Sequence, residues 1–188
     1  MQLHGGIRFA TNSSGQFPTN KYYSAVPQME DDSFSYTCCQ ISLDSADGTV
    51  WIVYSAVDFG KDGAGTGQSF VIYPKNSGRW IDVGFPIKSA QGFDVNTPTM
   101  AIFEHSQYRG TMLSTRMNIS NLKPYFPPGA APGVSSVIAT SGLWRLYSKT
   151  GFNGSYCEVD AKHKTQEIRN FADIGFNDRA QSLEVISR

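Results

Sequence analysis

The sequence feature that most constrains the fold is a spacing of two aromatic residues and a glycine, which occurs twice. Both copies place four residues between the aromatics and one before the glycine, and they are Phe103, Tyr108, Gly110 and Tyr147, Phe152, Gly154. This spacing suits a hairpin that folds back over itself, with a backbone angle at the glycine that a side chain would disfavour. Two such hairpins in tandem, each followed by β-rich sequence, predict one Greek-key β-sandwich over residues 99–188.

A longer repeat relates the two halves of the chain. The frames Trp-x-x-Tyr-Ser-x-x-x-Phe and Asp-x-Gly-Phe each occur twice, starting at Trp51 and Trp144 and at Asp82 and Asp173, which are 93 and 91 positions apart. Two frames in one order at nearly one offset indicate a duplicated domain. We therefore interpret residues 1–98 as a divergent copy of the domain in 99–188, with 91–99 as the linker.

These segments resemble the βγ-crystallin superfamily. Besides the hairpins, residues 121–126, 136–144 and 175–178 are similar to family segments that join or enter its strands. The resemblance covers residues 99–188 well and 1–98 in part, as in a two-domain invertebrate member of the sponge-crystallin kind. It implies an all-β protein of two Greek-key β-sandwich domains, 1–98 and 99–188, of which the N-terminal one is divergent.

Composition excludes several other classes of protein. Lys and Arg number 16 against 16 Asp and Glu, so the formal net charge is zero, and we expect neither nucleic acid nor a membrane as partner. The N-terminus lacks the apolar segment of a signal peptide, and residues 50–57 are too short to span a bilayer. Three cysteines, Cys38, Cys39 and Cys157, make no disulfide framework. We expect a cytoplasmic protein, monomeric or weakly dimeric.

The resemblance also implies calcium binding. In the family, the pattern [Asn/Asp]-[Asn/Asp]-x-x-[Ser/Thr]-Ser occurs once per Greek-key motif, and the two motifs of a domain exchange ligands. Residues 177–182 keep the first two positions and the last, whereas 131–136 keep only the two serines. The resemblance therefore implies one weak Ca²⁺ site, formed by Asn177, Asp178, the Ser135 hydroxyl, and the backbone carbonyls of Arg179 and Ser148.

The mirror site and the N-terminal copy are poorer in oxygen donors. The mirror site would combine Glu104, Gly133 and Gln181 with Ala131 or Pro132, and we expect it to be weak or empty. In the N-terminal copy, Pro86 and Ile87 replace the Asn-Asp pair, and Ser42 aligns with Ser135 but has no acidic partner. We predict no site of this type there.

Simpler interpretations stand beside these. Asn-Asp is an ordinary turn pair. Ser136 and Ser182 suit structural hydroxyls that tie a hairpin to its sheet, and Trp51 and Trp144 suit core packing.

A thiol enzyme would need Cys38 or Cys39 beside His4, His105 or His163. No spacing in the sequence supports such a pair, so we expect no enzyme. The expected function is a structural, stability-type protein with weak calcium binding in its C-terminal domain. The alternative is a glycan- or protein-binding module that uses the N-terminal insertion at residues 60–68.

Overall fold

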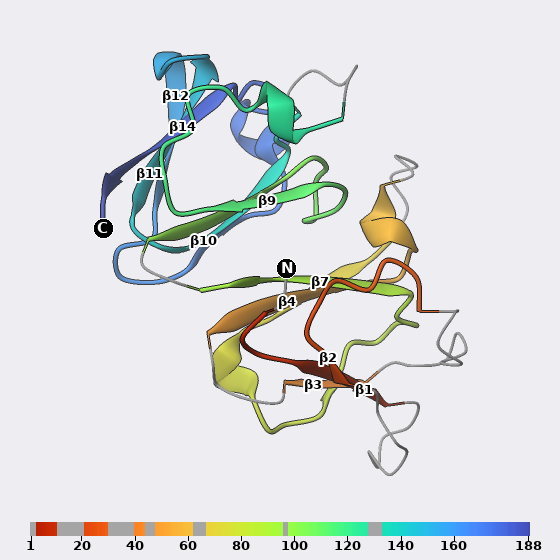
Figure 1. Ribbon diagram of the computed structural model, residues 1–188. Helices are drawn as coiled ribbons and strands as arrows, with labels where there is room; N and C mark the ends of the chain where they lie inside the picture. The colour runs from red at the N-terminus through yellow and green to blue at the C-terminus, as the bar shows by residue number, and fades with distance from the viewer. Residues whose placement is uncertain are drawn as a thin grey trace. The chain divides into compact units, whose positions relative to one another are not determined.

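The chain forms two compact units, Met1–Val95 and Asn96–Arg188. The computed structural model describes residues 3–10, 21–29, 40–43, 48–61, 67–95, 98–127 and 133–188. Each unit is built from antiparallel strands and short 3₁₀ helices (Figure 1), which confirms the all-β class. The predicted boundary between 98 and 99 lies three residues beyond the division at Val95.

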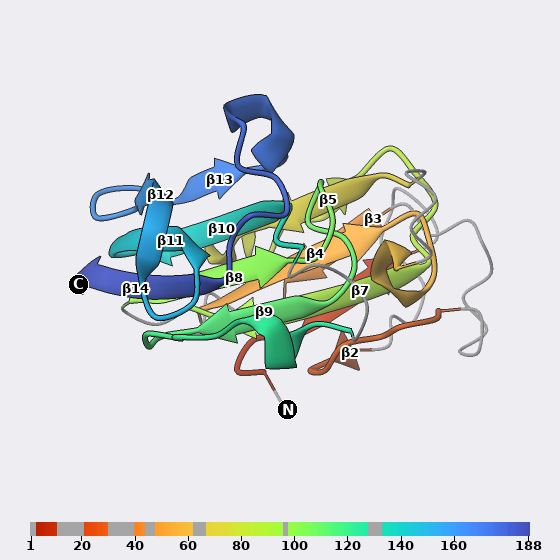
Figure 2. The same cartoon turned by 90° about the horizontal axis from the view of Figure 1, so that it is seen from above.

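The C-terminal unit has two sheets, ordered β13-β10-β8-β9 and β12-β11-β14 (Figure 2). Strand β13 follows β12 in the chain but pairs with β10, and Ile119 pairs with Leu183 of β14, so each Greek-key motif gives its third strand to the other motif's sheet. The elements are β8 Thr99–Phe103, β9 Met112–Thr115, η4 Lys123–Tyr125, β10 Ser136–Ser141, β11 Leu143–Lys149, β12 Asn153–Asp160, β13 Gln166–Ile168, η5 Phe171–Ile174 and β14 Ser182–Ser187.

The N-terminal unit repeats this topology with shorter strands. Its sheets are ordered β2-β1-β3-β6 and β5-β4-β7, and Val26 pairs with Ala90 of β7. The elements are β1 Ile7–Ala10, β2 Lys21–Tyr22, β3 Gln40–Leu43, β4 Thr49–Tyr54, η2 Asp58–Gly60, β5 Ser69–Ile72, η3 Pro74–Asn76, β6 Ile81–Asp82 and β7 Ser89–Asp94.

Strand register carries the repeat at a constant offset. Three cross-strand pairs of the N-terminal unit recur 93 positions later, and they are Val26–Ala90 with Ile119–Leu183, Trp51–Gly92 with Trp144–Val185, and Tyr54–Ser89 with Tyr147–Ser182. Both tryptophans are fully buried, and their indole N–H groups donate to the carbonyls of Gly5 at 2.9 Å and Ser141 at 2.8 Å. The predicted core role of both tryptophans is confirmed.

A serine fastens each of three folded hairpins to its sheet. In each hairpin the second aromatic has a positive φ, and its N–H donates to a serine Oγ at 3.0–3.1 Å; the pairs are Phe59–Ser89, Tyr108–Ser136 and Phe152–Ser182. The same hydroxyl donates to the carbonyl three residues before that aromatic, at 2.6–2.7 Å; these carbonyls are Ala56, His105 and Lys149. The predicted structural role of Ser136 and Ser182 is confirmed, and Ser89 is a third case that the sequence did not reveal.

The fourth motif, at the start of the chain, has lost this arrangement. The register places Ala10 opposite Gln40, where the other motifs place an aromatic opposite the serine. Phe9 instead points into the core, where its ring lies 5.6 Å from that of Tyr22. At these two positions the first motif therefore lacks both the aromatic residue and the serine.

The expected linker differs from the structure. Residues 91–94 belong to β7, because Gly92 allows Trp51 and Leu3 to pack against the strand. A Cβ at Gly92 would lie 3.0 Å from the Trp51 ring and 2.9 Å from Leu3 Cδ1.

The serine tether can be tested at Ser182. The substitution Ser182→Ala removes two hydrogen bonds from a buried site and leaves the Phe152 N–H without its acceptor, so the free energy of unfolding of the C-terminal unit should fall by about 1–3 kcal/mol. Ser155→Ala, at an exposed serine, is the control and should change it by less than about 0.5 kcal/mol. Equal effects of the two variants in denaturant unfolding would show that the tether contributes little.

Candidate calcium site

The Asn177–Asp178 pair occupies a tight turn between η5 and β14. Phe176 is buried immediately before the turn, and Asp178 has a φ of 54°, a left-handed conformation that Asn and Asp adopt more readily than other side chains. The Asp178 N–H donates to the carbonyl of Val134 at 3.4 Å, which ties the turn to the segment preceding β10. The buried Phe176 side chain and this backbone hydrogen bond therefore hold the turn in place.

Three of the five predicted ligands converge at this turn. The buried Ser135 hydroxyl donates to Asp178 Oδ1 at 3.1 Å, and Asn177 Nδ2 donates to the other carboxylate oxygen at 2.5 Å. Asp178 is exposed and Asn177 half-buried, so the carboxylate has access to solvent. Ser135 and Asp178 come from different Greek-key motifs, as the expected exchange of ligands requires.

The structure does not bring Ser148 to this turn. The Ser135 N–H donates to the Phe103 carbonyl at 3.0 Å, which places Ser135 beside the hairpin that starts at Glu104. The equivalent bond of the other motif joins the Gln181 N–H to the Tyr147 carbonyl at 2.8 Å, so Ser148 lies beside Gln181. The assignment of Ser148 is therefore corrected. Ser135 and the hairpin beside it belong to the same Greek-key motif, because backbone hydrogen bonding between their strands continues to Ser135. The Asn177–Asp178 turn comes from the other motif of the domain.

Arg179 contributes a cation next to the site in sequence. Its guanidinium donates to the Gly175 carbonyl at 3.3 Å and lies 5.9 Å from the Phe176 ring, so its charge is held against the turn. Within the described parts of the chain, no cluster of three or more His, Cys, Asp or Glu residues could hold a metal. A cation at this turn would therefore depend on one carboxylate and on amide, hydroxyl and carbonyl oxygens.

The mirror position offers fewer described donors. Ala131 and Pro132 lie outside the described residues. Glu104, which we expected at the mirror site, lies instead in the hairpin beside Ser135, where its carboxylate accepts the N–H of Thr111 at 3.0 Å. The hairpin that lies beside Gln181 is the one at Ser148. The expectation of a weak or empty mirror site stays a prediction.

The N-terminal unit is shortened at the corresponding turn. Three residues separate Phe85 from Ser89, whereas five separate Phe176 from Ser182, and Ile87 within the short segment is buried. The register also corrects the alignment of Ser42, because Gln40 rather than Ser42 matches the strand position of Ser136. The absence of a calcium site of this type in the N-terminal unit stays a prediction. Its physical basis is that the corresponding turn is two residues shorter.

The comparisons with known proteins concern the fold. Residues 99–186 match the family model described as Beta/Gamma crystallin. Nearly the whole chain is similar in structure to geodin, a beta-gamma crystallin from Geodia cydonium, with a TM-score of 0.74 and 18% identity over 96% of this chain and 98% of geodin. No curated protein matches the sequence.

Single-domain structures are similar to about half of the chain. A beta gamma crystallin from Ciona intestinalis has a TM-score of 0.40 and 24% identity over 46% of this chain and 98% of its own. A transition-metal-ion-binding betagamma-crystallin from Methanosaeta thermophila has a TM-score of 0.37 and 23% identity over 46% of this chain and 99% of its own.

Of the three cysteines, the structure describes Cys157. Cys38 and Cys39 lie outside the described residues, as do residues 62–66 of the insertion. Burial raises the pKa of the Cys157 thiol, and the neighbouring Glu158 carboxylate raises it further. His4 contacts the carboxylate of Asp94 at 3.0 Å.

In the parts of the chain that are described, no helix has the length and apolar content needed to cross a bilayer.

The raised pKa of Cys157 predicts a sluggish thiol. In a Cys38→Ser/Cys39→Ser background, iodoacetamide should alkylate Cys157 more slowly at pH 7 than it alkylates an unstructured cysteine peptide, because the reactive thiolate is scarcer. The rate should still be rising above pH 9, where the peptide approaches its plateau. A rate at pH 7 that equals or exceeds that of the peptide would contradict this.

Proposed function

Because the chain belongs to the βγ-crystallin superfamily through residues 99–186, we propose that it is a non-enzymatic structural protein whose C-terminal unit binds one Ca²⁺ ion weakly. The observation that carries the proposal is the contact between Ser135 and Asp178, at 3.1 Å, across 43 residues of sequence and two Greek-key motifs. The contact gathers a carboxylate, a hydroxyl and an amide at one exposed turn.

The donor set suits a hard cation. Ca²⁺ takes six to eight oxygen ligands at 2.3–2.6 Å, and water completes incomplete sets. The ligands we propose are the Asp178 carboxylate, the Ser135 hydroxyl, the Asn177 amide oxygen, and the carbonyls of Arg179 and Glu104. Ion binding would require the Ser135 O–H and the Asn177 N–H groups to turn away from the carboxylate, since both now donate to it.

The charge of the site sets its strength. One carboxylate supplies a single formal negative charge, and the Arg179 guanidinium held against the turn opposes it. Affinity falls as the number of charged ligands falls, so we propose a Kd of about 10⁻⁴ M or weaker.

Ion binding would act on stability. The ion would join the turn before β14 to the residue before β10, and it would bind only the folded chain. A ligand at 100 times its Kd stabilises the folded form by about 2.7 kcal/mol. The same residues without an ion are an ordinary hydrogen-bonded turn, and a titration separates the two cases.

Calcium should raise the thermal stability of the full chain. At 10 mM CaCl₂, which is 100 times a Kd of about 10⁻⁴ M, the melting temperature of the C-terminal unit should rise by about 10–20 °C, or by less for a weaker Kd, and excess EDTA should reverse the rise. MgCl₂ at the same concentration is the control and should have a much smaller effect, because Mg²⁺ requires a tighter octahedral shell. The absence of any rise in melting temperature, together with no heat in calorimetric titration, would remove the calcium proposal.

The substitution Asp178→Asn should abolish the calcium effect. Asparagine tolerates the φ of 54° and can still accept the Ser135 hydrogen, so the variant loses the charge without new backbone strain. Asp82→Asn is the matched control, since Asp82 is an exposed aspartate of the N-terminal unit that accepts the Gly84 N–H at 2.8 Å. Asp178→Asn should show no calcium-dependent shift in melting temperature, while Asp82→Asn should keep the full shift. A full shift in Asp178→Asn would locate the ion elsewhere.

A further inference from the structure

Strand β12 leaves a long backbone edge open in the C-terminal unit. It has eight residues, Asn153–Asp160, and is the longest of the strands that the structure describes. It lies at one edge of the sheet β12-β11-β14 (Figure 1), and no described strand pairs with its outer side. An open edge of this length is a template on which another strand can pair.

The other described sheet edges are covered or short. Ile119 exchanges two backbone hydrogen bonds with Leu183 of β14, at 2.9 and 3.0 Å, which covers that edge. Val26 exchanges two with Ala90 of β7, at 2.7 and 2.9 Å. The remaining edge strands among the described residues have four residues or fewer, and they are β2, β5, β6, β9 and β13. A further strand therefore finds most backbone to pair with at β12.

The backbone of β12 directs three residues toward its open side. The Ala161 N–H donates to the Gly142 carbonyl at 2.9 Å, and bonded and non-bonded pairs alternate along an antiparallel ladder. Tyr156, Glu158 and Asp160 therefore occupy non-bonded positions opposite β11, so their N–H and C=O groups point away from it. All three residues are exposed. Each offers one backbone donor and one acceptor to a partner strand.

A cation lies close to this edge on the outer face of the sheet. The Arg145 guanidinium lies 4.6 Å from the centre of the Tyr156 ring, and its Nε donates to Glu158 Oε2 at 3.0 Å. Arg145 belongs to β11, so its position over the Tyr156 ring carries the charge across β12 toward the open side. A carboxylate on a next strand, about 4.8 Å beyond Tyr156, would face this charge.

Charge favours one register for a second copy of the same strand. Two β12 strands that pair antiparallel about a two-fold axis through Cys157 set Tyr156 of each copy opposite Glu158 of the other. The carboxylate of one copy then faces the Arg145 guanidinium of the other, and symmetry repeats the contact. A shift one way sets Glu158 opposite Glu158, which places like charges together. A shift the other way sets Glu158 opposite Gly154, whose φ of 85° interrupts the strand.

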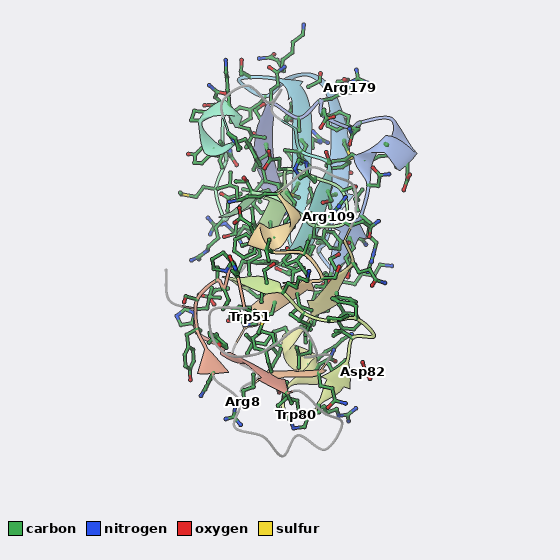
Figure 3. All side chains as sticks on the ribbon, turned by 90° about the vertical axis from the view of Figure 1, so that its right-hand side faces the viewer. Arg8, Trp51, Trp80, Asp82, Arg109 and Arg179 are labelled. Carbon is green, nitrogen blue, oxygen red and sulfur yellow. The ribbon has the colours of Figure 1, made fainter. Side chains whose placement is uncertain are left out.

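We propose that the chain self-associates through β12, in a weak antiparallel dimer whose two β12 strands join the sheets of both copies. Pairing of one strand edge buries less area than the roughly 1,200–2,000 Å² of a stable interface, so the Kd should be about 10⁻⁴–10⁻³ M. A foreign strand bound at this edge would instead leave the protein monomeric when it is alone in solution. The calcium turn, marked by Arg179 in Figure 3, lies outside β12, so the dimer is measured in EDTA.

Protein concentration gives the first test on the full-length chain. Sedimentation velocity should show a rising share of dimer between about 0.02 and 1 mM. Over the same range the amide NMR signals of Tyr156, Glu158 and Asp160 should shift together, because their N–H groups face the edge. The amides of Cys157 and Val159, which point toward β11, should shift less. A monomer at every concentration, or shifts confined to another segment, would overturn the proposal.

Charge reversal tests the register. Arg145→Glu and Glu158→Lys should each weaken self-association by about tenfold or more, since like charges then meet at both symmetry-related contacts. Mixing the two variants should restore the dimer, because opposite charges then face each other at both contacts. Mixing repairs no contact within one chain, so the restored dimer isolates the contact between copies. Lys123→Glu, at an exposed lysine of η4, is the matched control and should associate as the parent does.

A mixture that associates no more tightly than either variant alone would contradict this interface.

A proline tests the contribution of the backbone. Glu158→Pro removes an N–H that faces the edge, a position at which an edge strand tolerates proline, and it should abolish the dimer. Glu158→Gln keeps that N–H and loses the same charge, so it should weaken the dimer only severalfold. Circular dichroism checks that both variants keep the fold. Equal self-association of the two variants would show that the strands do not pair through their backbones, and it would overturn the proposal.

Discussion

The hydrogen bonds of a buried serine to a folded hairpin are the interaction on which this structure depends. An aromatic residue with positive φ turns its N–H toward the sheet, and the serine of the closing strand accepts that N–H while donating to a hairpin carbonyl. Because a buried unpaired amide is costly, the hairpin, its ring and the serine must be kept together. In the C-terminal unit the same contact sets Ser135, one residue before Ser136, beside the hairpin and within reach of Asp178.

The two units share the serine tether but differ in the turn that precedes their last strand. The C-terminal unit keeps both tethers and the five-residue turn that carries Asp178. The N-terminal unit keeps the tether at Ser89, but three residues rather than five separate Phe85 from Ser89, so we expect this shorter turn to present no matching carboxylate. In our account, duplication preserved the core and left this turn free to diverge.

Much of this fold was predictable from spacing. The aromatic-glycine frames fixed two hairpins, and the tryptophan frame revealed the duplication, because a duplicated core keeps its large buried side chains. The tether at Ser89 was missed, since Gly60 follows Phe59 directly and disguises the frame. The sequence predicts a linker at Gly92, because it does not show that the Trp51 ring occupies the space where a side chain would lie. The wrong assignment of Ser148 had a similar cause: which hairpin lies beside Ser135 is a fact of strand pairing, and identical motifs leave it open.

The most direct test of the account follows backbone amide signals by NMR during a calcium titration of the full-length protein. The account predicts that the amides of residues 104, 135 and 177–179 shift together and saturate with one affinity, because one ion contacts both motifs. The amides of Ser148 and Gln181, at the mirror position, should stay in place. Shifts confined to 148 and 181, or no saturable shift at 135 and 178, would contradict the central claim that Ser135 and Asp178 share one ion.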